Sequence, residues 1–232
     1  MNPPENNQSN WRIHYYPDIV EAGGVREALA SLSREGGNHL TLSAHNPENN
    51  WSIATFASPR GDMRVNLGTN ARRFSITLSS GGRGFVWACG STDDLPSVAE
   101  VMKSWKSGLD LRGLRQKFPF MQSDRLSQAY EDGNPEEVQW DILINDPNFS
   151  GYRDLLLALR EKPTLRELFP FISHWTLGLR RADGSETENV LWIRPRPNGA
   201  FTVWTSSTEE QRREWHRIDD LVMAASTLAE EL

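Results

Sequence analysis

The chain has 232 residues, of which 38% are hydrophobic and nine are Trp, so it is long and apolar enough for one large domain or two small ones. Its formal net charge of −6 argues against a general nucleic-acid-binding protein, because such proteins carry a basic excess. The chain has a single cysteine, Cys89, which excludes an internal disulfide and a thiolate-rich metal site and fits a reducing cytoplasm. Because Cys89 lies on a predicted strand, we expect its thiol to be buried and unreactive. The N-terminus lacks the charged and apolar regions of a signal peptide, and no apolar run approaches the roughly 18 residues of a membrane helix. We therefore expect a cytoplasmic protein without a membrane segment.

The sequence of the first part of the chain predicts a polar tail, a helix and a series of strands. Residues 1–10 are polar and rich in Pro and Asn, which is typical of a disordered tail. Trp11–Tyr16 is interpreted as a short strand or a packed arm, and apolar residues at helical spacing predict a helix over Val25–Arg34 that Gly36-Gly37 closes. Alternating apolar residues with intervening turns then predict an antiparallel meander. Its strands are His39–Ala44, Trp51–Ala57, Met63–Leu67, Arg73–Leu78 and Phe85–Cys89.

The rest of the chain predicts helices followed by a second set of strands. Hydroxyl and acidic residues at Ser91–Asp94 cap a helix with an apolar stripe. Residues 124–168 are interpreted as mostly helical. A final helix is expected to start at Thr208 and to run through Leu228. The second set of strands comprises His174–Leu179, Val190–Arg194 and Phe201–Thr205.

Several segments of the first half recur in the second half. Phe118-Pro119-Phe120 recurs at residues 169–171, and His39-Leu40-Thr41-Leu42 resembles His174-Trp175-Thr176-Leu177. Residues 85–94 align without a gap to residues 201–210. This repeated order predicts an α+β fold of two pseudo-symmetric halves, each an antiparallel β-meander flanked by helices. The alternative is that the two halves resemble each other by chance, because strand and helix-cap patterns are common. The expected parts are a disordered tail at 1–10, a first half at 11–120, a helical bridge at 121–168 and a second half at 169–232.

His39 and His174 are the candidate catalytic residues. They occupy the same place in the repeated strands, and a two-fold relation between the halves would turn both imidazoles toward one groove, where a ligand is expected. An imidazole titrates near neutral pH and suits proton transfer. The alternative is that both are polar strand residues or are held by a backbone carbonyl, because no cluster of His, Cys and carboxylates with ligand spacing surrounds them.

Arginine and tryptophan residues of the strands are the candidate substrate-binding residues. Four arginines on neighbouring strands are suited to hold a carboxylate or a phosphate, although exposure on a strand face is the alternative: Arg180, Arg181, Arg194 and Arg196. Of these, Arg180 and Arg194 are the candidates. Five tryptophans of the strands either line an aromatic groove or are buried in the core, namely Trp51, Trp87, Trp175, Trp192 and Trp204. Of these, Trp87, Trp175 and Trp204 are the candidates. The sequence contains no metal-ligand constellation and no nucleotide-binding fingerprint, so we expect neither a metal nor a cofactor.

A run of motifs carries a family resemblance. Gly90-x-Thr92-x-Asp94-Leu95 precedes a helix ending Trp105-x-x-Gly108-x-x-Leu111-x-x-Leu114, which leads to Phe118-Pro119-Phe120. There follow Ala129-Tyr130-Glu131-x-Gly133, Trp140 and Leu165-Arg166-x-Leu168-Phe169-Pro170-Phe171-x-Ser173-His174. Together these motifs resemble an actinomycete family of domains of unknown function whose members are labelled natural-product biosynthesis proteins, over roughly residues 16–228. The family has no agreed reaction, so the resemblance implies no catalytic residue.

The resemblance and the residues together favour two functions. The first is a cofactor-independent tailoring or cyclising protein that binds a peptide or polyketide intermediate between the halves, with His174 or His39 as proton shuttle. Accessory proteins that form the lysinoalanine bridge of cinnamycin-like lantibiotics illustrate such a reaction. The second is a non-catalytic binding protein, namely a chaperone, scaffold or immunity-type partner of a larger pathway enzyme. Neither function involves nucleic acid or a membrane, and a monomer or a homodimer fits both.

Overall fold

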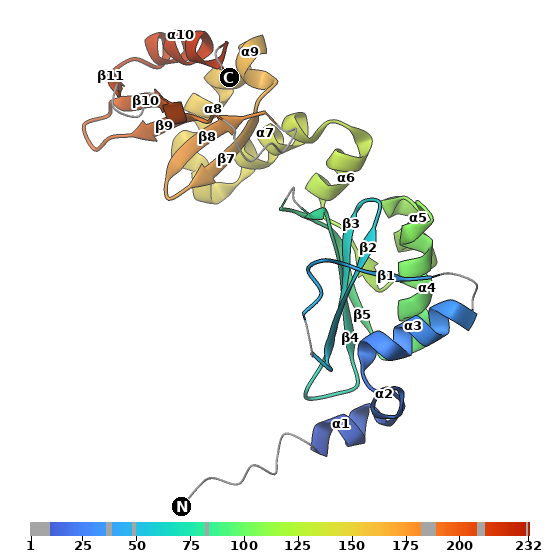
Figure 1. The fold of residues 1–232 in the computed structure, drawn as a ribbon. Helices are drawn as coiled ribbons and strands as arrows, with labels where there is room; N and C mark the ends of the chain where they lie inside the picture. The colour runs from blue at the N-terminus through green and yellow to red at the C-terminus, as the bar shows by residue number, and fades with distance from the viewer. Residues whose placement is uncertain are drawn as a thin grey trace, which may run out of the picture. The chain divides into compact units, whose positions relative to one another are not determined.

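The computed structural model describes residues 10–35, 39–47, 50–81, 84–181, 189–207, 212–230 and 232. The expectations for a tail at residues 1–9, a helix end at Gly36-Gly37 and a helix start at Thr208 fall outside these ranges. The chain divides into two compact units, Met1–Glu131 (unit 1) and Asp132–Leu232 (unit 2), and each is described by itself. Each unit contains one antiparallel sheet and several helices (Figure 1). The expected α+β class, with an antiparallel meander in each half, is therefore confirmed.

Unit 1 consists of N-terminal helices, a meander of strands and a second group of helices. Its sheet follows chain order from β1 to β6, so the meander predicted between residues 39 and 89 is confirmed, although its first strand is only two residues long. The helices are α1 (Asn10–Tyr15), α2 (Pro17–Ala22), α3 (Val25–Glu35), α4 (Leu95–Lys106), α5 (Leu111–Lys117) and α6 (Arg125–Asp132). The strands are β1 (Thr41–Leu42), β2 (Ile53–Ser58), β3 (Gly61–Leu67), β4 (Phe74–Ser79), β5 (Val86–Thr92) and β6 (Met121–Gln122).

Alternation along the strands buries one face of this sheet. Phe74 and Ile76 of β4 are buried in a core shared with α3, α4 and α5, which lie along the same side of the sheet (Figure 1). Helix α4 begins where the carboxylate of Asp94 accepts a 2.9 Å hydrogen bond from the backbone N–H of Ser97. The helix contributes Trp105, which is fully buried, to this core.

The opposite face of the same sheet is polar. Arg64, Thr77 and Cys89 are direct cross-strand neighbours on β3, β4 and β5. The thiol of Cys89 is free and exposed on this face. The prediction of a buried Cys89 is therefore wrong, because the strand turns this position away from the core.

The N-terminal segment is helical rather than extended. Tyr16, between α1 and α2, is fully buried, and its hydroxyl oxygen accepts a 2.9 Å hydrogen bond from the backbone N–H of Arg73. Trp11 of α1 packs edge to face against Tyr16 and against Trp51. Of the two interpretations of Trp11–Tyr16, the short strand is wrong, whereas a packed segment is what the structure shows, because contacts with distant residues position it.

An ion pair between α2 and the loop before β4 makes the stability of unit 1 depend on pH. Arg72 donates to both carboxylate oxygens of Asp18 at 2.8 Å, and these hydrogen bonds hold the pKa of Asp18 below its ordinary value. A pKa lowered by folding contributes stability above the unfolded-state pKa of about 4, and this contribution is lost as the pH falls through the folded-state pKa.

Asp18→Asn is therefore expected to lower the unfolding free energy by a constant amount above about pH 5, and by a progressively smaller amount below about pH 4. Urea denaturation of the parent chain and the variant across this range measures the difference. If the difference is the same at about pH 2 as at neutral pH, the ion pair is not its cause.

Unit 2 begins with helices, continues as a meander and ends with a helix. Its strands follow chain order from β7 at one edge to β11 at the other. The helices are α7 (Pro135–Asn145), the 3₁₀ helix η3 (Pro147–Tyr152), α8 (Arg153–Arg160), α9 (Pro163–Arg166) and α10 (Ile218–Ala229). The strands are β7 (Phe169–Ser173), β8 (Thr176–Arg180), β9 (Leu191–Pro195), β10 (Phe201–Thr205) and β11 (Arg213–Trp215). The predicted final helix is thus too long at its start, because β11 pairs with β10 before α10 begins.

The helices of unit 2 pack on one face of its sheet. Leu177 and Leu179 of β8 and Ile193 of β9 are buried in one core with side chains of α7, α8 and α10. Trp140 of α7 is fully buried, and its indole N–H donates to the carbonyl oxygen of Leu168 at 3.1 Å, which joins α7 to the start of β7. Because side chains alternate along a strand, the residues between these core residues lie on the other face.

The repeated segments occupy different places in the two units. Thr41–Leu42 forms β1 at the edge of the first sheet, whereas Thr176–Leu177 begins β8 in the interior of the second. Phe118 caps the end of α5, whereas Phe169 begins β7. The units share the order of helices, meander and helix, but the sequence repeats do not mark equivalent positions. The segment 121–168, predicted as a helical bridge, begins with strand β6 and is divided between the units, with most of α6 in unit 1 and α7 to α9 in unit 2.

Candidate functional site

Three aromatic side chains lie in one row across the second sheet. The register makes Phe171 of β7, Gly178 of β8, Trp192 of β9 and Trp204 of β10 successive cross-strand neighbours. On β8 and β9, these positions alternate with core residues, so the row lies on the sheet face opposite the helices. We call Phe171, Trp192 and Trp204 the aromatic row.

The rings of the aromatic row contact one another. Phe171 meets Trp192 edge to face with ring centroids 5.4 Å apart, and Trp192 stacks on Trp204 at 6.4 Å with an interplanar angle of 21°. Gly178 makes room for this arrangement, because a Cβ atom added there would lie 2.4 Å from Cζ of Phe171. The missing side chain therefore allows the Phe171 ring to lie across β8.

Four arginines surround the aromatic row on the same face. We call Arg180, Arg194, Arg196 and Arg212 the arginine set. The guanidinium carbon of Arg180 lies 5.5 Å from the ring centroid of Phe171, and those of Arg194 and Arg212 lie 5.7 and 4.6 Å from the ring of Trp204. Nε of Arg196 donates to Oγ1 of Thr202 at 2.8 Å. The face thus combines positive charge with flat aromatic surface.

The turn between β9 and β10 forms a hollow at one end of this face. Its volume is about 460 Å³. The lining residues are Arg196, Pro197, Asn198, Thr202, Arg212 and Glu214. The amide of Asn198 donates to the carboxylate of Glu214 at 3.2 Å. Two guanidinium groups therefore share this hollow with one carboxylate, which gives it a net positive charge.

The positive charge of this face contrasts with the charge of the whole chain. The chain carries a net −6, whereas the arginine set contributes four positive charges and the hollow one carboxylate. Within the described ranges, no acidic side chain pairs with Arg194 or Arg196. Clustered like charges on a partly apolar surface produce a local potential that concentrates ions of the opposite sign. The arrangement is therefore suited to bind an anion.

The turn between β7 and β8 carries the candidate catalytic histidine. His174 and Trp175 have positive φ angles of 47° and 60°, and they form a two-residue turn between the paired residues Ser173 and Thr176. The strand predicted from His174 to Leu179 therefore starts at Thr176 instead. Trp175 is 68% exposed, and Nδ1 of His174 lies 3.1 Å from Oγ of Ser173. The imidazole thus lies at an exposed tip beside a hydroxyl group.

Tyr152 connects this tip to the arginine set. Its hydroxyl group donates to the carbonyl oxygen of Trp175, and the Trp175 ring packs against Phe149. Burial raises the pKa of Tyr152, and the positive charge of Arg194 opposes this rise. Nε of Arg194 donates to Oγ1 of Thr176 at 2.9 Å. The tip, Tyr152 and Arg194 therefore form a connected group at the same end of the sheet as the turn between β9 and β10.

Most of the predicted site residues lie on the second sheet or its first turn. These residues are His174, Trp175, Arg180, Arg194 and Trp204. The other two belong to unit 1. His39 is exposed, and its carbonyl oxygen accepts a hydrogen bond from Lys106. Trp87 is 8% exposed, and its indole N–H donates to the carbonyl oxygen of Arg60, so it is a core residue of unit 1.

Sequence reasoning did not select four residues of this face as candidates, although Trp192 was among the tryptophans considered for an aromatic groove. They are Tyr152, Phe171, Trp192 and Arg212. Alternation alone places Trp192 on the same face as Arg194, so this residue had a usable signal. The positions of Phe171 and Arg212 depend on how β7 and β11 pair, and Tyr152 comes from a helical segment, so no local pattern indicates them.

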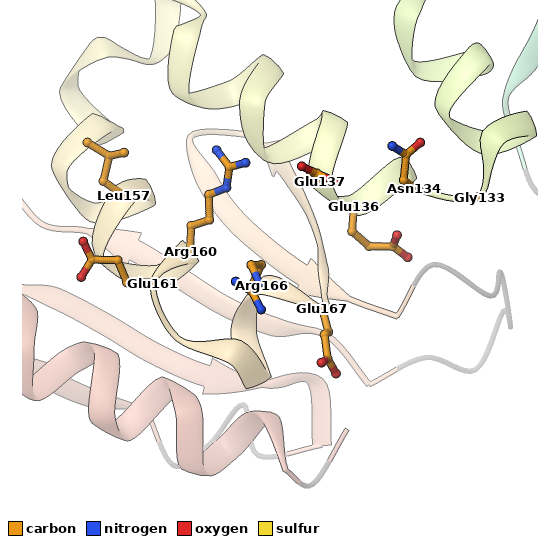
Figure 2. A pocket seen from close by; sticks show the side chains of 9 residues that line it. All are labelled: Gly133, Asn134, Glu136, Glu137, Leu157, Arg160, Glu161, Arg166 and Glu167. Atoms are coloured by element: carbon orange, nitrogen blue, oxygen red, sulfur yellow. The ribbon is translucent and has the colours of Figure 1, made fainter.

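A larger hollow of different character lies among the helices of unit 2. Its volume is about 720 Å³, and Figure 2 shows Glu136 and Glu137 on one side of it and Glu161 and Glu167 on others. The remaining lining residues are Gly133, Asn134, Leu157, Arg160 and Arg166. Four carboxylates and two guanidinium groups make this hollow acidic, and none of the predicted site residues lines it. Among the described residues, no group of three or more His, Cys, Asp or Glu side chains is arranged to hold a metal ion.

Unit 2 is thus an α+β module with helices on one sheet face and a basic, aromatic surface on the other. The sequence model of a family of unknown function, DUF6193, matches residues 136–232, which include the aromatic row, the arginine set and the turn at His174. The expected resemblance to a family of unknown function is confirmed for this part of the chain, and the match leaves residues 1–135 uncovered. No curated protein and no solved structure matches the chain. In the described ranges, no helix has the length and apolar character needed to cross a membrane.

Proposed function

We propose that unit 2 is a ligand-binding module that holds an anionic organic molecule against the aromatic row. The observation that supports the proposal is the arginine set, which places four guanidinium groups around three aromatic rings on one sheet face. We propose further that the ligand is a peptide or polyketide intermediate of natural-product biosynthesis. The protein then acts as a non-catalytic accessory partner of a larger pathway enzyme.

The chemistry of this face favours a ligand with both a carboxylate or phosphate and a flat or apolar part. A guanidinium group donates in a planar fork that fits such anions, and each charge-assisted hydrogen bond contributes about 1.5–3 kcal/mol. The half-buried rings of Phe171 and Trp192 offer contact area to an aromatic or aliphatic group. Arg194 is already oriented by Thr176, so less side-chain entropy is lost when it binds.

N-acetyltyrosine is a simple probe of this proposal, because it joins one carboxylate to one aromatic ring. We expect isothermal titration to show that it binds the full-length protein more tightly than N-acetyltyrosinamide, which lacks the charge. The double variant Arg194→Gln/Arg212→Gln should weaken binding of the acid by about tenfold or more, because two charge-assisted contacts are lost.

Arg213→Gln is the matched control, because it removes the same charge from the adjacent position, which pairs with the buried residue Val203 of the helix-covered face. This variant should bind the probe as the parent chain does. Equal affinity for the acid and the amide, or equal loss in Arg213→Gln and in the double variant, would contradict the proposal.

A second candidate function is a tailoring or cyclising reaction with His174 as proton shuttle. The observation that favours it is the exposed imidazole of His174 at the end of the same face, connected through the Trp175 turn and Tyr152 to Arg194. A His174→Gln strain of the producer separates the two functions. Loss of the final metabolite, with unchanged N-acetyltyrosine binding by the purified variant, identifies a catalyst, whereas an unchanged metabolite profile identifies a binding protein.

A further inference from the structure

We infer that the ligand of this face is an extended acidic peptide segment that lies across the strands, with one carboxylate side chain at each end of the aromatic row. The inference rests on the proposed function and adds the ligand's class, direction and spacing. It follows from where the arginines lie along the row.

Guanidinium groups lie at both ends of the aromatic row. Arg180 of β8 lies against Phe171 at one end, and Arg212, directly before β11, lies against Trp204 at the other. Three strand spacings of about 4.8 Å separate β8 from β11, so the two positions lie about 14 Å apart in the direction across the strands. An extended peptide rises about 3.3 Å per residue, so about four residues span this distance. Carboxylates at the first and fifth residues of a peptide therefore match the two arginines.

The surface between these ends suits the middle of such a peptide. Side chains of an extended peptide alternate between two sides, so the third side chain points to the sheet together with the first and the fifth. Trp192 and Phe171 are half buried and meet at 5.4 Å, which provides apolar contact for this third side chain. Arg194 lies beside the row and carries no acidic partner among the described residues, so it is placed to donate to a backbone carbonyl of the peptide. An extended conformation leaves those carbonyl oxygens available.

The contact between Arg212 and the ring of Trp204 favours an acidic peptide over single-stranded nucleic acid as the ligand. Trp204 is only 6% exposed, and the guanidinium carbon of Arg212 lies 4.6 Å from its ring centroid. A nucleobase has to displace this guanidinium group before it stacks on Trp204, whereas a carboxylate binds the exposed Arg212 side chain where it is.

Two capped isomeric peptides test the inference on the full-length protein. Ac-Glu-Ala-Phe-Ala-Glu-amide has the predicted spacing, and Ac-Glu-Glu-Ala-Phe-Ala-amide has the same composition and charge with adjacent acids. We expect the first to bind about tenfold more tightly than the second, because only the first reaches both arginines at once. Arg212→Gln and Arg180→Gln should each remove this preference, and Arg213→Gln should preserve it.

The outcomes separate the failure of the inference from that of the proposed function. If the two isomers bind with equal affinity and both bind more weakly to Arg194→Gln/Arg212→Gln, the inference of an extended peptide held at both ends is wrong. The proposal that this face binds anions then still stands. Tighter binding of oligothymidylate than of either peptide overturns the peptide assignment. If neither peptide nor N-acetyltyrosine binds, both the inference and the proposed function are wrong.

Discussion

Gly178→Ala is expected to disrupt the aromatic row and to weaken ligand binding. An added Cβ atom would lie 2.4, 2.7 and 2.9 Å from three carbon atoms of the Phe171 ring, which are closer than van der Waals contact allows. The ring has to swing away from β8, and it then loses its edge-to-face contact with Trp192. We expect about 1–3 kcal/mol of lost stability, typical of overpacking, and a clear loss of N-acetyltyrosine affinity.

Gly151→Ala is the matched control for this prediction. Gly151 also belongs to unit 2, and a Cβ atom added there meets nothing within 4 Å. Urea denaturation and isothermal titration of both variants compare them. If Gly178→Ala unfolds at the same urea concentration as Gly151→Ala and binds the probe equally well, the Phe171 ring does not depend on the space at Gly178.

Gly61→Ala is expected to have the largest effect on unit 1. Gly61 begins β3 with φ of +121°, and an added Cβ atom would lie 2.1 Å from the carbonyl oxygen of Ser79 and 2.6 Å from the carbonyl carbon of Ser80. These are backbone atoms of the adjacent chain segment, so no rotamer change relieves the clash. Backbone strain of about 1–3 kcal/mol and overpacking of about 1–3 kcal/mol predict a combined loss of about 2–6 kcal/mol.

Gly84→Ala distinguishes the two contributions. Gly84 has φ of +73°, but a Cβ atom added there meets nothing within 4 Å, so this variant carries backbone strain without the clash. Hydrogen exchange of the amides in β2, β3 and β4 reports the stability of this sheet directly. If the two variants lose the same protection, the close approach at Gly61 adds nothing to the strain.

The sequence was most informative where side chains alternate along a strand. Alternation is a local property, so it predicted the strands of both meanders, including the strand that carries Arg194. The residue types on these strands identified Arg180 and Trp204 as candidates, although the sequence left open whether each lies on a surface or in a core. That choice depends on which face the helices cover, and here they cover the face of Leu177 and Ile193.

The rest of the site depends on contacts between distant parts of the chain. Phe171 and Trp192 meet because β8 carries Gly178 between them, which is a property of the register of three strands. His174 was expected in a strand, but the turn there has positive φ angles at two residues that are not glycine, so the usual turn signal is missing. The helix of Trp11 depends in the same way on aromatic contacts to Tyr16 and Trp51.

The binding face of unit 2 is tested most directly by the indole N–H signals of the nine tryptophans in a proton–nitrogen correlation spectrum. N-acetyltyrosine is added to the labelled full-length protein, and each signal is assigned by a Trp→Phe variant. We predict that the signals of Trp192 and Trp204 shift in a saturable manner and that those of the buried residues Trp105 and Trp140 do not. Unchanged signals of Trp192 and Trp204 at saturating probe, or a shift confined to tryptophans of unit 1, would contradict the account.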